Sequence, residues 1–358
     1  MPRRTRARID LAALRANFRR ARQLAPEARS MAVVKADGYG HGLEQVATTL
    51  APLSETLAVA TLDEAERIRA CGIDAPVVLL EGVHEPGDWS VCFSQGFEPV
   101  IHSEHQFRGA DRFSAANALP VWLKCNTGMN RLGVGPDEVD AFISRIQRLS
   151  GLRLCGLMTH YACADDLDDP TTGIQAARLR EIVAAHPGLI TSAANSAAHF
   201  HEASRHFDLT RPGIMLYGGT PLLGRRGPDL GLRPVMKLES TVIAVRDIVA
   251  GESVGYGGTW TAPQATRMGI VEIGYGDGYP RHAPNGTPVA VNGVRCPLIG
   301  RVSMDMLAVD LSPCPRARPG AEVELWGETV SVDEVAELCE TISYELLTGV
   351  LPRVPRTY

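Results

Sequence analysis

The sequence predicts an α/β protein in which a (β/α)₈ barrel is followed by a mostly antiparallel β domain. A length of 358 residues exceeds that of one typical domain. Short apolar runs and helix-length segments alternate up to about residue 217, and beyond a segment rich in proline and glycine the apolar residues alternate with a period of two. We therefore expect the barrel over residues 1–225 and the β domain over residues 226–358.

The first expected element is an amphipathic helix over residues 9–23. Ile9, Leu11, Leu14 and Phe18 follow the spacing of one helical face, and Asp10 is suited to cap its N-terminus.

Eight short apolar runs follow and recur about every 25 residues, the length of one βα unit. Consecutive βα units imply parallel strands with right-handed crossovers, and eight units close a TIM-like barrel. Pro212 and Gly213 interrupt the last run, so we expect its strand to end near Arg211. The runs cover residues 31–35, 57–61, 77–81, 98–102, 121–124, 154–160, 190–194 and 209–217.

The segments after the linker predict the β domain. Asn292-Gly293 between Val291 and Val294 is a two-residue hairpin signal, and residues 332–341 read as one helix capped by Ser331 or Asp333. The expected strands cover residues 236–245, 268–273, 289–294 and 306–311.

Composition narrows the class of protein. The formal net charge of −5, with no basic stripe, does not suggest binding to nucleic acid or an anionic membrane, and the basic cluster at Arg3, Arg4, Arg6 and Arg8 is short. The eight cysteines form no C-x-x-C pair, which disfavours a metal site or a disulfide scaffold. No signal peptide or membrane span is apparent, so we expect a cytoplasmic protein.

The segment Ser30 to Gly42 carries the strongest chemical signal. Lys35 stands where a buried strand ends, and the glycine-rich loop after it allows positive φ and close approach to a ligand. Burying an unpaired ammonium is costly, so we expect Lys35 to be neutral, ion-paired or engaged as a Schiff base. A lysine that extends from the strand end into solvent is the plain alternative.

Polar residues also follow the other expected strands. Because the carboxyl ends of barrel strands meet at one face, these residues should converge there. An amine, a hydroxyl, backbone amides, a histidine and two guanidiniums suit a phosphorylated cofactor or substrate. The residues are Lys35, Tyr39, Lys124, Arg131, His160, Asn195, Ser196, Arg211, Gly213 and Ile214.

Together these motifs resemble the alanine racemase family, over essentially the whole chain. V-V-K-A-D-G-Y-G-H-G (residues 33–42) is similar to the pyridoxal phosphate lysine signature of that family. Further motifs follow in the family's order: L-K-C-N-T-G-M-N-R-L-G (123–133), H-Y-A (160–162), A-N-S-A (194–197), R-P-G-I (211–214), V-G-Y-G (254–257), G-Y-G-D-G-Y (274–279), R-V-S-M-D (301–305) and Y-E (344–345).

The resemblance implies a pyridoxal 5'-phosphate enzyme that interconverts L- and D-alanine with two bases. Lys35 would form the aldimine and act on one face of the substrate carbon, and Tyr256 would act on the other. The family is a head-to-tail homodimer in which this tyrosine comes from the second subunit.

The same resemblance assigns the cofactor contacts. The phosphate would be held by Tyr39, Ser196, Tyr344 and the amides of Gly213 and Ile214. Asn195 would lie beside the cofactor. Arg211 would face the pyridine nitrogen and leave it unprotonated, which disfavours side reactions, and His160 would link Arg211 to Tyr256.

Substrate contacts are implied as well. Arg131 and the Met304 amide would bind the carboxylate, and Tyr275, Asp305 and Tyr344 would narrow the entrance to favour small side chains. Lys124 matches a lysine that many members carry as a carbamate. This chain has Asn126 where the family usually has aspartate, and an ordinary ion pair is the alternative for Lys124.

Several other functions are compatible with a barrel. A racemase for serine, lysine or a broader set of amino acids is the nearest alternative. A non-enzymatic pyridoxal phosphate-binding protein would not need the β domain that carries Tyr256, and an amino acid decarboxylase would need a catalytic cysteine and a phosphate loop that we do not find. A lysine-dependent aldolase would need no cofactor. If the chain is an alanine racemase, D-alanine for peptidoglycan precursors is one expected role and D-alanine catabolism is another.

Overall fold

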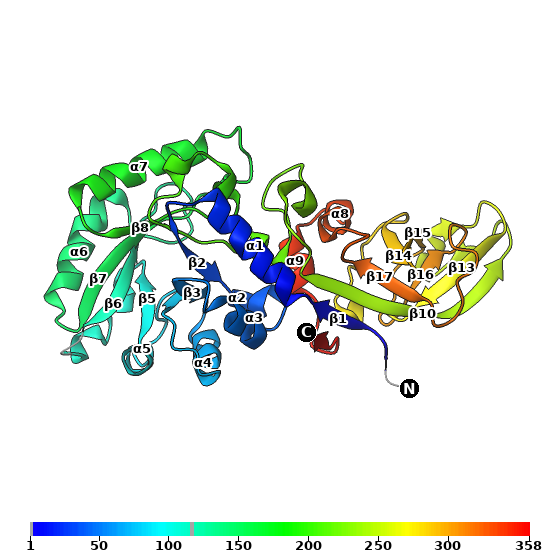
Figure 1. Ribbon diagram of the computed structural model, residues 1–358, viewed down its shortest axis with the longest axis horizontal. Helices are drawn as coiled ribbons and strands as arrows, with labels where there is room; N and C mark the ends of the chain where they lie inside the picture. The colour runs from blue at the N-terminus through cyan, green and yellow to red at the C-terminus, as the bar shows by residue number, and fades with distance from the viewer. Residues whose placement is uncertain (1–2, 115–117) are drawn as a thin grey trace.

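The computed structural model describes residues 3–114 and 118–358 and has two domains side by side (Figure 1). One domain is the predicted barrel, an eight-stranded sheet in the order β8-β7-β6-β5-β4-β3-β2-β9 with every pairing parallel. The strands are β2 (Arg29–Val33), β3 (Thr56–Val59), β4 (Val77–Leu79), β5 (Phe97–Ile101), β6 (Leu119–Lys124), β7 (Leu152–Met158), β8 (Ile190–Ser192) and β9 (Leu209–Thr210). All eight expected strands are confirmed.

The barrel is nearly closed, and the remaining gap lies between β8 and β9, the two ends of the sheet. β9 pairs with β2, and Asp208 bridges toward β8 because its amide donates to the Thr191 carbonyl at 3.1 Å and its carboxylate accepts from the Thr191 amide at 2.8 Å. β9 is short because Pro212 follows, as predicted.

Helices cover the outside of the barrel (Figure 1). The predicted first helix is confirmed as α1, and the Asp10 carboxylate accepts from the amides of Ala12 and Ala13 at 2.8 and 2.9 Å. After β5 and after β8, short 3₁₀ turns take the place of a longer helix, and those after β5 are η1 (Glu104–Phe107) and η2 (Ala110–Arg112). The helices are α1 (Leu11–Leu24), α3 (Leu43–Leu50), α4 (Leu62–Ala70), α5 (Asp88–Gln95), α6 (Val139–Arg148) and α7 (Thr171–Ala185).

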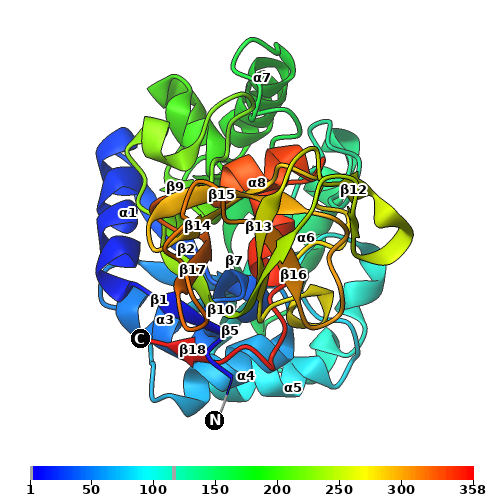
Figure 2. The same cartoon turned by 90° about the vertical axis from the view of Figure 1, so that its right-hand side faces the viewer.

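The second domain is a mostly antiparallel sheet, as predicted. Its longest strand, β10, pairs with both β17 and β13, which closes β10, β13, β16, β15, β14 and β17 into a ring. Figure 2 views this domain end on, in front of the barrel. The strands are β10 (Met236–Ile248), β13 (Thr266–Val271), β14 (Pro288–Val291), β15 (Val294–Ile299), β16 (Leu307–Asp310) and β17 (Glu322–Trp326), and β11 (Ser253–Val254) pairs with β12 (Trp260–Thr261) beside them.

The hairpin signal is confirmed, because β14 and β15 pair around Asn292 and Gly293, whose φ angles are 48° and 79°. The expected helix is α8 (Val332–Leu338) with Ser331 as its cap, and it ends before the predicted residue 341. A second helix, α9 (Ser343–Thr348), and strand β17 were not predicted.

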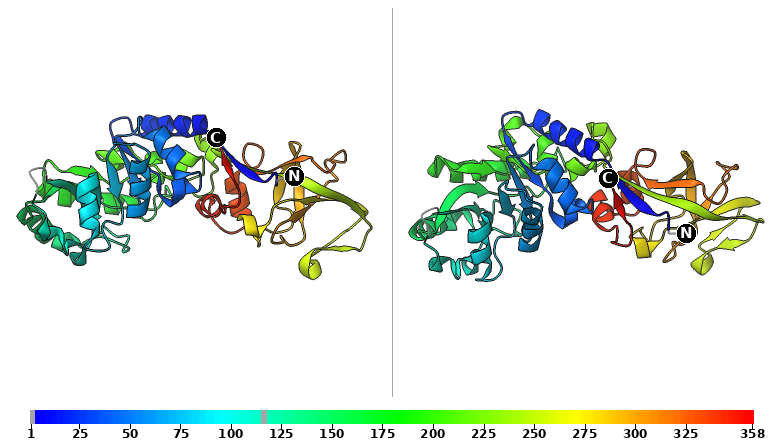
Figure 3. Two further views of the ribbon diagram at one scale, coloured as in Figure 1. Left: turned by 90° about the horizontal axis from the view of Figure 1, so that it is seen from below. Right: turned by 60° about the horizontal axis from the view of Figure 1, so that its bottom comes forward.

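The two ends of the chain tie the domains together. Strand β1 (Arg6–Ile9) pairs with β10 on one side and with β18 (Arg356–Thr357) on the other, so residues 6–9 belong to the second sheet. This strand was not predicted, and the domain boundary after residue 225 stays a prediction. Figure 3 shows β1 leading from the β domain to α1, with the C-terminus at the junction.

The core consists of one large apolar cluster with smaller satellites. All eight cysteines are free. None of the helices in residues 3–114 and 118–358 has the length and apolar composition that a membrane crossing requires.

Candidate active site

A cavity of about 680 Å³ opens at the carboxyl ends of the barrel strands, and α9 of the β domain closes one side of it. It brings together eleven of the residues expected at the site. They are Lys35, Tyr39, Lys124, Arg131, His160, Asn195, Ser196, Arg211, Gly213, Ile214 and Tyr344. The barrel topology explains this convergence, because parallel strands deliver their last residues to the same face.

Lys35 follows β2 directly and begins an unusual turn. Ala36, Asp37, Gly38 and Tyr39 have φ angles of 54°, 54°, 61° and 51°, so the backbone makes one left-handed helical turn, labelled α2 (Lys35–Tyr39). Such a conformation costs roughly 1–2 kcal/mol for each residue that has a Cβ. Within the described chain no carboxylate pairs with Lys35. The amine therefore faces the cavity without a counter-ion.

A cradle for an anion lies across the cavity from Lys35. The Ser196 hydroxyl accepts from the Gly213 amide at 2.7 Å, and the Ile214 amide, which begins the 3₁₀ turn η6 (Ile214–Tyr217), donates to no acceptor in the described residues. A Cβ on Gly213 would lie 2.4 Å from the Tyr39 hydroxyl, so only glycine allows these groups to approach. Amides and hydroxyls in this arrangement suit a phosphate.

Aromatic packing fixes the Tyr39 side of the cradle. The Tyr39 ring stacks on Tyr217 at 4.6 Å between centroids, and the Tyr217 hydroxyl donates to the Val33 carbonyl at 3.0 Å. The ring centroid of Tyr344, in α9, lies 6.1 Å from that of Tyr39. Burial raises the pKa of both Tyr39 and Tyr344, so both phenols stay protonated and remain hydrogen-bond donors.

Arg211 lies buried in the floor of the cavity. Its Nη1 donates to the Ser192 hydroxyl at 2.6 Å, and its Nη2 donates to the carbonyls of Thr159 and Ala193 at 2.5 and 3.0 Å. Burial lowers the pKa of Arg211 to about 10, which leaves it protonated at neutral pH. Among the described residues, every hydrogen bond of the guanidinium starts from Nη1 or Nη2, so Nε–H is available to a ligand.

His160 is held by Arg211. The Arg211 Nη2 lies 3.2 Å from His160 Nδ1, and a guanidinium can only donate, so Nδ1 is the acceptor and Nε2 carries the proton. Burial, followed by the charges of Arg211 and Lys124, lowers the pKa of His160 well below its usual value. The ring is therefore neutral and has one N–H to donate.

Lys124 and Arg131 form a second cationic group in the cavity. Burial, then the charges of Arg211 and Arg131, lowers the pKa of Lys124 to about 8. Asn126 does not contact Lys124 in the described hydrogen bonds. Its side chain instead folds the loop that leads to Arg131, because its Oδ1 accepts from the amides of Gly128 and Asn130 at 3.1 and 3.0 Å.

These groups fit pyridoxal phosphate. The cavity offers an amine for the aldehyde, neutral donors for the phosphate and a guanidinium N–H for the ring nitrogen. No part of this donor set resembles a metal site, and the described residues hold no cluster of three or more metal-binding side chains.

Four predicted residues do not line this cavity. Tyr256, Tyr275, Met304 and Asp305 all belong to the β domain, and Tyr256 and Met304 are 67% and 53% exposed. Two of their loops are joined, since the amides of Tyr275 and Gly276 donate to the carbonyls of Ser303 and Met304 at 3.0 and 2.8 Å. One chain therefore brings together the barrel half of the expected site and leaves the other half apart.

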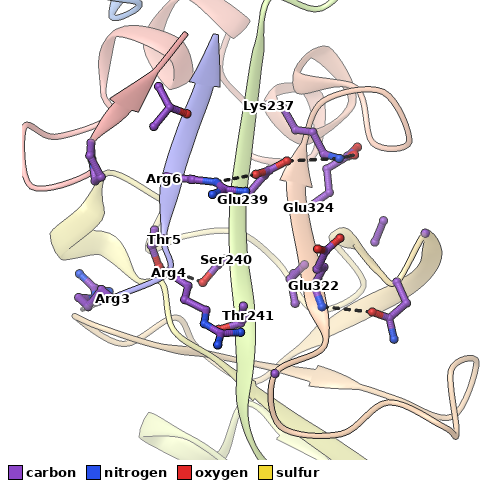
Figure 4. Close-up of a pocket in the computed structure, with 17 residues that line it drawn as sticks. Arg3, Arg4, Thr5, Arg6, Lys237, Glu239, Ser240, Thr241, Glu322 and Glu324 are labelled. Carbon is purple, nitrogen blue, oxygen red and sulfur yellow. Dashed lines mark hydrogen bonds and ion pairs between the residues drawn. The ribbon is translucent and has the colours of Figure 1, made fainter. Parts of the chain in front are cut away.

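A second hollow, of about 570 Å³, lies on the β domain at β1, β10 and β17 (Figure 4). It is lined by none of the predicted catalytic residues. Its charges also compensate one another, because Arg6 pairs with Glu239 at 2.9 Å and Lys237 pairs with Glu324 at 3.4 Å. The N-terminal arginines thus serve the fold, and the barrel cavity is the better candidate site.

Sequence reasoning missed some residues of the cavity. Glu81 lies just beyond β4 and lines the wall, and the strand-end rule that selected the other residues would have found it. Ile342 lines the cavity, and Tyr217 supports it by packing against Tyr39; both positions depend on tertiary packing, for which the sequence has no local signal.

Comparison with known proteins covers the whole chain. The family model described as alanine racemase, N-terminal domain, matches residues 9–221, and the model described as alanine racemase, C-terminal domain, matches residues 235–358. The chain is 54% identical to the alanine racemase of Marinobacter nauticus over 100% of both chains, and 48% identical to that of Shewanella loihica over 98% of this chain and 97% of the other.

Solved structures agree with these matches. The biosynthetic alanine racemase from Pseudomonas aeruginosa has a TM-score of 0.95 at 45% identity, over 100% of this chain and 99% of that one. The alanine racemase from Bartonella henselae with covalently bound pyridoxal phosphate has a TM-score of 0.90 at 30% identity, over 100% of both chains.

Proposed function

This chain belongs to the alanine racemase family, and from that premise we propose how its own residues share the reaction. It is a pyridoxal phosphate-dependent isomerase that interconverts L-alanine and D-alanine. The observation that carries the assignment of residues is the barrel cavity, in which Lys35, the anion cradle and buried Arg211 line one space.

We assign the cofactor contacts as follows. Lys35 would hold pyridoxal phosphate through Nζ, and Asn195 would lie beside it. The phosphate would be held by the cradle of Tyr39, Ser196, Tyr344 and the Gly213 and Ile214 amides. When bound, the cofactor supplies an electron sink that stabilises negative charge at the substrate α carbon. Arg211 would donate Nε–H to the ring nitrogen and would keep that nitrogen unprotonated, because a guanidinium does not release a proton near neutral pH.

Two bases on opposite faces of the α carbon are needed for inversion. The Lys35 amine would hold or accept the proton on one face. Tyr256 serves the other face and comes from a second copy of the chain, in a homodimer whose active sites are shared. Its exposure of 67% in the single chain supports this assignment. His160 donates Nε2–H to the Tyr256 oxygen and so stabilises the phenolate.

Arg131 and the Met304 amide of the partner bind the substrate carboxylate. Lys124 orients Arg131 when it carries a carbamate, whose negative charge attracts the guanidinium. The lowered pKa of Lys124, about 8, supports this, because a larger fraction of the amine is neutral and able to react with carbon dioxide than for an ordinary lysine. Tyr275 and Asp305 of the partner, with Tyr344, narrow the entrance for a small side chain.

We also propose a cytoplasmic location and a role in supplying D-alanine for peptidoglycan precursors. The similarity to a structure called biosynthetic supports the latter proposal.

A racemisation assay with added pyridoxal phosphate over a panel of L-amino acids tests the substrate. We expect alanine to be converted fastest, with serine slower and lysine not converted, because the entrance admits only small side chains. Comparable rates for serine or lysine would favour a broad-specificity racemase and contradict the assigned entrance. Borohydride reduction followed by peptide mapping tests Lys35 directly, and modification of any other lysine would contradict its role.

A further inference from the structure

The left-handed turn that follows Lys35 is braced from outside the barrel. The residues that follow the turn fold back on it. His41 Nδ1 lies 3.1 Å from the Gly38 carbonyl and 2.8 Å from the Tyr39 carbonyl, and the Gly42 amide donates to the Asp37 carbonyl at 2.9 Å. The carbonyls of the next two residues, Gly40 and His41, have no partner within this segment. They are satisfied by the last residues of the β domain.

Arg356 and Tyr358 provide these contacts. Arg356 Nε donates to the Gly40 carbonyl at 3.0 Å, and the Tyr358 hydroxyl donates to the His41 carbonyl at 3.1 Å. A Cβ on Gly40 would lie 2.2 Å from the Leu347 carbonyl, and one on Gly42 would lie 1.9 Å from the Tyr358 oxygen. Glycine at both positions lets the β domain approach the turn this closely.

Arg356 is an unusual brace because it contacts carbonyls rather than a carboxylate. Besides Gly40, its guanidinium donates to the carbonyls of Val350, Leu351 and Val354 at 2.6, 2.9 and 2.9 Å. Residues 356–357 also form β18, which pairs with β1 in the second sheet. The brace therefore connects the Lys35 turn to the sheet of the β domain.

We propose that Arg356 and Tyr358 are positioning residues, which hold the strained turn so that Lys35 and Tyr39 point into the cavity. The inference rests on the proposed roles of Lys35 and Tyr39. A left-handed turn with three residues that carry a Cβ persists only where its surroundings fix it. Glu64 and Arg67 of the barrel also hold the start of the turn, through the Ala36 amide at 2.6 Å and the Asp37 carboxylate at 2.7 Å. Loss of the brace therefore loosens the end of the turn and the aim of Lys35 and Tyr39 without abolishing the turn.

The test compares four full-length variants with the parent. Arg356→Met removes the brace, Arg356→Lys restores a cation with fewer donors, and Tyr358→Phe removes one hydroxyl. Arg8→Met is the matched control, because Arg8 lies opposite Thr357 in the β1–β18 pair and contacts Glu239 rather than the turn. Each protein is assayed for kcat and KM with alanine, for pyridoxal phosphate affinity by absorbance titration, and for amide hydrogen exchange.

We expect Arg356→Met to lower kcat by between about tenfold and a hundredfold, with weaker cofactor affinity and faster exchange at residues 36–42 but not in β3 to β5. Arg356→Lys should recover part of the loss, Tyr358→Phe should lose several-fold, and Arg8→Met should match the parent. Changes in kcat and cofactor affinity that follow faster exchange throughout the barrel would indicate a purely structural role and overturn the proposal. Unchanged kcat and affinity in a variant whose turn exchanges faster would also overturn it.

Two safeguards keep the outcomes distinct. If Arg356→Met does not fold, Tyr358→Phe carries the same test through the loss of a single oxygen. Racemisation by the parent and the borohydride mapping of Lys35 are measured first, so a failure of the proposed function is seen before any variant is compared.

Discussion

The cavity at the carboxyl ends of the barrel strands and the Tyr256 face of the β domain, the surface that carries Tyr256, Met304 and Met306, differ in how much of a binding site each one forms. In the barrel cavity, Arg211 and Lys124 are only 4% and 8% exposed, whereas on the β domain Tyr256, Met304 and Met306 are 67%, 53% and 42% exposed. Buried cations that face a cavity indicate a prepared binding site, and clustered exposed apolar side chains indicate a surface that another protein covers. This difference supports the proposal that a single chain builds the cofactor half of the site in the barrel, while Tyr256 and Met304 of the β domain complete the site of a second copy.

The largest expected effect comes from a substitution of Tyr256 on the β domain. Tyr256→Phe should lower racemisation by about 10³-fold or more, because one of the two bases is lost, while pyridoxal phosphate binds as in the parent. Steady-state rates and the cofactor absorbance measure the two effects separately. Tyr161→Phe is the control, since its hydroxyl bonds the Arg205 carbonyl at 3.0 Å outside the cavity. Racemisation at the parental rate would remove Tyr256 from the mechanism.

Most of the barrel part of the candidate site could be predicted from the sequence. The eight strands follow from buried apolar runs that are punctuated by glycine and proline, and the strand-end rule then gathers Lys35, Lys124, His160 and Arg211. The left-handed turn was only hinted at by its glycines, because Ala36 and Asp37 carry no signal for positive φ.

Contacts between distant segments could not be predicted. Strand β1 was missed because its alternation is four residues long and its partner, β10, lies far along the chain. Helix α9 was not predicted because it is only six residues long and has no side-chain cap. The brace from Arg356 was not predicted because contacts to backbone carbonyls leave no pattern in residue spacing. The proposed role of Tyr256 rests only on the resemblance, since an exposed tyrosine between glycines is otherwise an ordinary turn residue.

A medium effect is expected from the exposed apolar surface. Met306→Glu should raise the dimer dissociation constant by roughly a hundredfold, because a carboxylate would have to be desolvated at the proposed interface. Sedimentation velocity over a range of concentrations measures it. Ile174→Glu, on the outer helix α7, changes a residue that is 49% exposed and should leave the dimer intact. Equal dissociation of both variants would mean that the Tyr256 face is not the interface.

The smallest expected effect concerns stability in the barrel half. The pKa of Lys124 is lowered from 10.5 to about 8, mainly by burial, so between these pH values the unfolded chain binds a proton that the folded chain does not. The free energy of unfolding of the parent therefore rises with pH through this window, and the cost of the buried charge is fully present below pH 8.

Lys124→Met should accordingly be more stable than the cofactor-free parent at pH 7, by about 2 kcal/mol, with the gap closing as the pH approaches 10. Urea denaturation in buffer free of carbon dioxide measures it. Lys237→Met is the control, because Lys237 is an ion-paired residue of the β domain whose side chain is 28% exposed. A gap that is constant with pH would show that the Lys124 charge is not responsible.

The division of the site between two chains is tested most directly by mixing inactive Lys35→Ala and Tyr256→Phe homodimers. In a mixed dimer one site carries both substitutions and the other carries neither, so activity should return as subunits exchange, approaching one native site in each mixed dimer. If exchange is proven by mass spectrometry and no activity returns, Lys35 and Tyr256 of different chains do not form one site.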